Sequence, residues 1–199
     1  ISPKTRAILI NFPNNPTGAV LDKVETDELV KLAKENNVYI ISDEIYSSMA
    51  FPESNFTSLL EYREDYQKIF VIDGFSKAYS MTGWRVGYLI GPQEQILRVS
   101  ILQQHLNTNI PVFIQRGAEA ALDLPVTFTE KYNTHLIHNA VVLNRIISES
   151  ETLSCNKTRG GMFSVINISK LNIDSDSFCT DLLRSTSVAA TPGVIFDKD

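Results

Sequence analysis

Apolar runs in the first half of the chain alternate with polar, turn-forming stretches. Four of these runs are short and rich in β-branched and aromatic residues, as buried strands are, and they span 6–13, 38–46, 68–76 and 84–92. Between the first two runs, residues 26–37 carry apolar positions at helical spacing, with Thr26 as the expected N-cap. Strand–helix–strand units of this length predict a doubly wound α/β sheet.

Beyond Pro92 the pattern becomes helical. Helices are expected in three consecutive stretches, over 93–107, 111–123 and roughly 126–150. Shorter elements are expected after residue 157, namely a glycine turn and a strand over 159–169, a helix over 175–187, and a strand with a turn over 188–196.

This change of pattern predicts two parts. Residues 1–125 read as part of a mostly parallel sheet with flanking helices, and residues 126–199 as a bridging helix followed by part of a smaller α+β domain. The chain starts just before a strand and stops shortly after a strand-like run, so we expect a fragment of a longer protein.

Composition narrows the function classes. The 199 residues are 43% hydrophobic and 21% charged, as in ordinary globular proteins. A net charge of -5 disfavours nucleic acid as a partner, because binding to phosphates needs a basic surface. We expect neither a membrane span nor a signal peptide, since apolar runs fall short of ~20 residues and the first residues lack the tripartite signal pattern.

The possible metal ligands form no recognisable set. Cys155 and Cys179 lie far apart without a zinc or disulfide motif, so both are expected to be free thiols. His135 and His138 have i,i+3 spacing but no third ligand nearby. We therefore predict that the protein has no metal site.

Polar side chains follow three of the predicted strands. Asn15 comes after the first strand, Asp43 and Tyr46 end the second, and Lys77 follows the third. Ligands of open α/β sheets bind outside the carboxyl ends of the strands, so these residues are expected on one rim. Arg85 lies close by in sequence.

An aldehyde cofactor would use this set of groups. A lysine amine forms a Schiff base with pyridoxal phosphate, and Lys77, once freed, could move a proton as general base and acid. A carboxylate such as Asp43 keeps the pyridine nitrogen protonated. A phenol and an amide can bond the ring oxygen O3′, and an arginine suits the phosphate.

Each residue taken alone also has a structural interpretation. "NPTG" could be a plain turn, and Asp43 could belong to a solvated loop. Tyr46 could pack on the sheet, Lys77 could be a surface lysine, and Arg85 could belong to a surface ion pair. All these interpretations would have to coincide at matching strand ends, which favours the cofactor hypothesis.

These residues carry a resemblance to a known family. "NNPTG", "SDEIY" and "GFSKAYSMTGWRVGY" are similar to motifs of the fold-type I, class I/II aminotransferases, which use pyridoxal phosphate. Gly74, Ser76, Lys77 and Arg85 match the constrained positions of the family's lysine signature. "MTGWRVGY" resembles the aspartate-type, broad-specificity branch, and the similarity weakens after about residue 125.

The resemblance implies a role for each site residue. Lys77 would be the Schiff-base lysine and Asp43 the partner of the pyridine nitrogen. Asn15 and Tyr46 would contact O3′, and Arg85 would bind the phosphate. It further implies a cytoplasmic homodimer that moves an α-amino group from an amino acid to a 2-oxo acid, with the fragment inactive alone.

Some family features are missing from this chain. Many members have a serine where Gly74 stands, and the arginine that clamps the substrate carboxylate is expected beyond Asp199. The family's glycine-rich phosphate loop and the aromatic residue that stacks on the ring also lie outside the chain. Two alternatives stay open: another pyridoxal-phosphate reaction, such as a β-elimination or cyclopropane-forming elimination, and a non-catalytic effector-binding domain.

Overall fold

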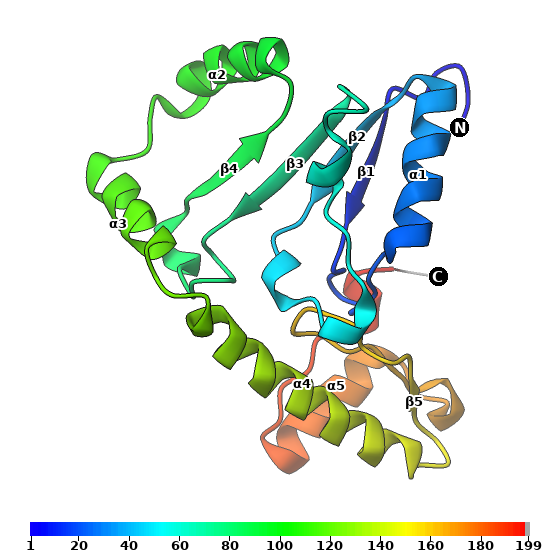
Figure 1. The fold of residues 1–199 in the computed structure, drawn as a ribbon. Helices are drawn as coiled ribbons and strands as arrows, with labels where there is room; N and C mark the ends of the chain where they lie inside the picture. The colour runs from blue at the N-terminus through cyan, green and yellow to red at the C-terminus, as the bar shows by residue number, and fades with distance from the viewer. Residues whose placement is uncertain (198–199) are drawn as a thin grey trace.

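A four-stranded sheet forms the main body of the computed structural model, which describes residues 1–197 (Figure 1). Its strands, in spatial order, are β1 (Ala7–Asn11), β2 (Tyr39–Asp43), β3 (Ile69–Gly74) and β4 (Gly87–Ile90). The first three are parallel, whereas β4 runs antiparallel to β3. The predicted mostly parallel α/β sheet is therefore confirmed.

Helix α1 (Lys23–Asn36) connects β1 to β2 and begins earlier than predicted. Asp22 is the N-cap: its side chain accepts the Glu25 N–H, and Glu25 accepts the Asp22 N–H in return. The predicted cap, Thr26, is wrong, because it lies inside the helix, 1% exposed, and donates to the Asp22 carbonyl. The helix ends at Asn37, whose φ of 54° is left-handed.

The main core lies between α1 and one face of the sheet. Its buried members are Val30, Ala33, Val38, Ile40, Leu59, Ile69 and Val71. The opposite face is different, since Leu9 is 71% exposed and Ile72 is 38% exposed. Within residues 1–197 Leu9 therefore has little cover on this face, whereas α1 packs on the other face of the sheet.

Three helices follow β4, as predicted. They are α2 (Gln93–Asn107), α3 (Val112–Leu122) and α4 (Thr127–Ser148). Ala118 and Ala121 of α3 pack with Phe75, Met81 and Val86 in a second apolar cluster near the lysine segment. In residues 1–197 no helix has both the length and the apolar character that a membrane crossing requires.

The C-terminal region is smaller and lies below the sheet in Figure 1. It contains α5 (Ser175–Thr186) and a two-stranded antiparallel sheet of β5 (Ser154–Cys155) and β6 (Ile166–Asn167). The division at residue 125 stays a prediction. Both cysteines are free, as expected.

Two strand predictions in this region need correction. The strand expected over 159–169 is reduced to β6, and the one expected over 188–196 is wrong, because that segment has only a 3-10 turn at Gly193–Ile195. A strand needs a neighbour for its backbone groups, and Pro192 also lacks an N–H to donate.

Candidate active site

The polar residues predicted to share a rim follow the carboxyl ends of three neighbouring strands. Asn11, the last residue of β1, is in register with Asp43, the last residue of β2. Asn15 and Tyr46 lie a few residues beyond these ends, and Lys77 follows β3 by three residues. The sheet topology thus places groups from three separate segments at one edge.

Tyr46 is at the centre of this group. It is 5% exposed, and its side chain shares a hydrogen bond with the side chain of Asn15. Its ring packs edge-on against the ring of Phe163, with 5.3 Å between the two ring centroids. The Lys77 ammonium lies 5.7 Å from the centroid of the Tyr46 ring. Burial raises the pKa of Tyr46, the charge of Asp43 raises it further, and the bond to Asn15 opposes both effects.

Asn11 joins two of the predicted residues, and we did not predict it. Its amide nitrogen donates to the Asp43 carbonyl at 3.1 Å, and its amide oxygen accepts the Asn15 N–H at 2.9 Å. The Asp43 carboxylate is itself held by the N–H of Ile45 at 3.1 Å. The only sequence signal for Asn11 is its position, as a polar residue ending an apolar strand directly before the turn.

Arg85 is the predicted site residue that the structure does not bring to this group. Its side chain is exposed and donates to the Thr82 carbonyl at 3.0 Å, within its own turn. Its φ of 55° is left-handed, as the residue that ends a short 3-10 helix. Asn15, Asp43, Tyr46 and Lys77 are therefore linked through Tyr46, and Arg85 stands apart.

A buried acid, Glu44, supports the site from behind. It is 3% exposed, and its carboxylate accepts hydrogen bonds from Ser42 Oγ at 3.0 Å, Ser58 Oγ at 2.6 Å and the Leu59 N–H at 3.0 Å. Burial raises its pKa despite these three donors. Glu44 thus ties the end of β2 to the segment before β3.

A second shielded acid, Asp73, lies beside the lysine segment. It accepts hydrogen bonds from the Gly74 N–H at 2.6 Å and from Ser47 Oγ at 3.2 Å, and it also bonds the phenol of Tyr88. Burial raises the pKa of Asp73, with the charge of Asp43 adding to it. Burial and Asp73 together raise the pKa of Tyr88 to about 12.

The glycine at position 74 has a local structural reason. Gly74 faces Gly87 across β3 and β4, and a Cβ on Gly74 would lie 2.8 Å from the Gly87 Cα. Such a contact with backbone cannot be relieved by turning a side chain. A serine at this position would require the two strands to move apart.

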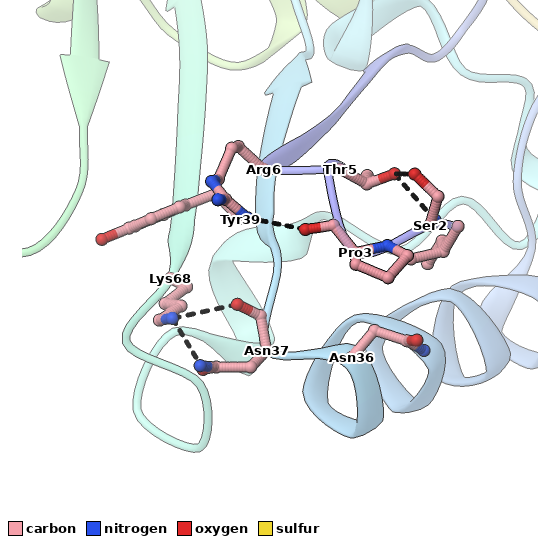
Figure 2. Close-up of a pocket in the computed structure, with 9 residues that line it drawn as sticks. Ser2, Pro3, Thr5, Arg6, Asn36, Asn37, Tyr39 and Lys68 are labelled. Carbon is pink, nitrogen blue, oxygen red and sulfur yellow. Dashed lines mark hydrogen bonds between the residues drawn. The ribbon is translucent and has the colours of Figure 1, made fainter.

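A separate hollow of about 460 Å³ lies at the opposite, amino-terminal edge of the sheet (Figure 2). Its cationic side chains are engaged within the chain. The Lys68 ammonium donates to the carbonyl and side-chain oxygens of Asn37, at 3.0 and 2.6 Å, and the Arg6 guanidinium donates to the Pro3 carbonyl at 3.1 Å. The hollow is therefore unrelated to the residues around Tyr46.

Comparison with known proteins identifies the family of this chain. The family model for aminotransferase class I and II matches residues 1–198. This chain belongs to that family. It is 38% identical to an aspartate aminotransferase from Thermotoga maritima and 36% identical to a (5-formylfuran-3-yl)methyl phosphate transaminase from Methanocaldococcus jannaschii. Each alignment covers 98% of this chain and about half of the relative, 50% and 51%.

Solved structures give the same result. A Pyrococcus protein named protein-A1 matches with a TM-score of 0.90 at 30% identity, over 100% of this chain and 51% of that one. The Thermotoga maritima aspartate aminotransferase structure matches with a TM-score of 0.84 at 36% identity, over 98% and 50%. The fold of the family is thus shown, for a chain that spans about half the length of these relatives.

Proposed function

We propose that this chain is the lysine-bearing part of a pyridoxal-phosphate-dependent aminotransferase, which moves an α-amino group from an amino acid to a 2-oxo acid. The observation that carries this proposal is the group around Tyr46, where Asn15 and Lys77 arrive from different strands beside Asp43. Membership of the family supports it.

The residues present fit this cofactor. When bound, pyridoxal phosphate supplies an aldehyde that an amine can capture and a ring that withdraws electrons. The site offers it an amine on Lys77, a carboxylate on Asp43, and a hydrogen-bonded amide–phenol pair. These are the complementary groups for an aldehyde, a pyridine nitrogen and a ring oxygen.

Each side chain has a proposed role. Lys77 would hold the cofactor through its amine, and the same amine could move a proton at the substrate carbon. Asp43 keeps the pyridine nitrogen protonated, while Asn15 and Tyr46 donate to O3′. Arg85 binds the phosphate, for which its guanidinium has to turn away from the Thr82 carbonyl.

We propose that the complete protein is a cytoplasmic homodimer. Helix α2 supports the dimer, because none of its residues is buried and Leu97, Ile101 and Leu106 are each at least 58% exposed. The free thiols are compatible with a reducing compartment. Sedimentation of the complete protein would test the subunit number.

The test of the proposal is covalent trapping of the cofactor. The complete protein is mixed with pyridoxal phosphate, reduced with borohydride and digested, and the labelled peptide is identified. A single label on Lys77 is expected, lost in Lys77→Ala and kept in Lys68→Ala, which changes a lysine at the opposite edge of the sheet. Labelling spread over exposed lysines would contradict the proposal.

The reaction itself is tested on the complete protein. An aminotransferase requires a 2-oxo acid to consume the amino group, so turnover of an amino acid should stop when the 2-oxo acid is omitted. Release of ammonia or pyruvate without an added 2-oxo acid would instead indicate an elimination reaction on the same fold.

A further inference from the structure

Residues 158–163, which we call the strap, cross the candidate site from the C-terminal region. The backbone N–H groups of Arg159 and Gly160 both donate to the Gly18 carbonyl, at 2.8 and 3.1 Å. The Arg159 carbonyl accepts the Phe51 N–H at 3.0 Å, and the Gly161 N–H donates to the Met49 carbonyl at 3.0 Å. The strap therefore bonds the turn that carries Asn15 and the segment that follows Tyr46.

Close packing makes the crossing specific to glycine. A Cβ on Gly18 would lie 2.7 Å from Thr158 Cγ2, and a Cβ on Gly160 would lie 2.9 Å from Val20 Cγ2. The strap also ends on the site itself, because Phe163 supplies the ring that meets Tyr46. A change in the position of the strap would therefore change the packing of Phe163 on Tyr46.

The side chain of Arg159 anchors the strap. Its guanidinium donates to the Val20 carbonyl at 3.2 Å and to the Ser54 carbonyl at 3.0 Å, which lie 139 and 105 residues away in sequence. The carboxylates of Asp22 and Glu25 lie at 3.7 and 4.0 Å and keep a balancing charge nearby. One cation therefore spans the end of the Asn15 turn and the end of the Tyr46 segment.

We propose that Arg159 is a positioning residue that holds Asn15 and Tyr46 at hydrogen-bonding distance from each other. This inference rests on the proposed function, since the pair is assigned to the cofactor oxygen O3′. Asn15 lies in a turn, and Tyr46 directly precedes a short 3-10 helix, Ser47–Met49. Arg159 bonds Val20, beyond the turn, and Ser54, which ends the next 3-10 helix. It reaches the cofactor through these segments and does not touch the reacting atoms.

The first test needs no cofactor. Amide hydrogen exchange is measured on the 199-residue chain, on Arg159→Met, and on Arg184→Met as a control that removes an exposed arginine from the last turn of α5. Arg159→Met should speed exchange by about tenfold in peptides covering 14–20 and 46–54, because two charged hydrogen bonds are lost. Arg184→Met should leave these peptides unchanged.

The second test reads the cofactor oxygen. Donors to O3′ stabilise its negative charge, so they make the neighbouring lysine-bound nitrogen easier to deprotonate. With pyridoxal phosphate bound, Arg159→Met should move the pH midpoint of the visible absorbance band upward by about 0.5–1 pH unit, the equivalent of one hydrogen bond. Arg159→Lys, which keeps the charge but lacks the two guanidinium nitrogens that donate to the two carbonyls, should shift it less.

The outcomes separate this inference from the proposed function. Unchanged exchange in Arg159→Met overturns the inference whatever the cofactor does. Faster exchange with an unmoved midpoint shows that Arg159 is only structural, which also overturns it. If the complete protein gives no band at Lys77, the proposed function fails together with the assignment to O3′, and the exchange test still decides whether Arg159 holds the two segments.

Discussion

Gly18, the last residue of the "NPTG" turn, offers a direct test of the crossing between the turn and the strap. Its φ of 68° is left-handed, which costs a residue with a Cβ about 1–2 kcal/mol. The new methyl group would also lie 2.7 Å from Thr158 Cγ2 and 2.9 Å from the Phe163 carbonyl oxygen. Overpacking of this kind costs about 1–3 kcal/mol, so Gly18→Ala should lose about 2–5 kcal/mol of unfolding free energy.

Urea unfolding followed by circular dichroism measures this loss. With a slope of about 2 kcal/mol per molar, the midpoint should fall by about 1–2.5 M. Gly83→Ala is the matched control, because its Cβ would have nothing within 4 Å. The unfolding free energy of Gly83→Ala should be unchanged or higher by up to about 1 kcal/mol, because an alanine gives the unfolded chain less conformational entropy than a glycine does.

Two results would refute the reasoning. Equal midpoints for Gly18→Ala and Gly83→Ala would mean that the turn and the strap are not in contact in solution. A midpoint and slope in Gly18→Ala equal to those of the parent chain would mean that neither the left-handed backbone nor the close contact costs the folded state free energy.

Three further predictions concern the sheet and its buried acids. Ile40→Ala removes a side chain that is 0% exposed and should lower the unfolding free energy by about 2–5 kcal/mol. Leu9→Ala changes a side chain that is 71% exposed and should alter the unfolding free energy by no more than about 0.5 kcal/mol. Equal losses for the two variants in urea unfolding would show that the Leu9 face is covered. Because the pKa of Glu44 is raised above 4.5 by folding, the folded state binds its proton more tightly, so stability falls as pH rises through the window above 4.5. Glu44→Gln should lack this fall, and parallel pH profiles of unfolding free energy for the variant and the parent would contradict the assignment. Asp73→Asn should lower the pKa of Tyr88 from about 12 towards 10.0, though not fully because burial remains, and ultraviolet titration against Tyr88→Phe measures this.

Local patterns were enough to place the sheet and to select the candidate site. The β-branched runs predicted all four strands of the main sheet, because a strand buried on a face needs apolar residues whatever its partners are. The rim rule then brought Asn15, Tyr46 and Lys77 together from sequence alone. Helix boundaries were less predictable, because Asp22 and Thr26 are both residue types that cap helices well. Only the structure shows that Asp22 has the extended backbone conformation of an N-cap.

Long-range contacts determined everything else. Three features depend on which segment lies opposite the residue concerned. They are the exposure of Leu9, the absence of the strand predicted over 188–196, and the need for glycine at position 74. The same holds for the hydrogen bonds of Asn11 and Arg159, whose partners lie up to 32 and 139 residues away in sequence. A sequence pattern reports what a residue can do, whereas a hydrogen bond or a steric contact also requires a partner, and only the tertiary structure supplies that partner.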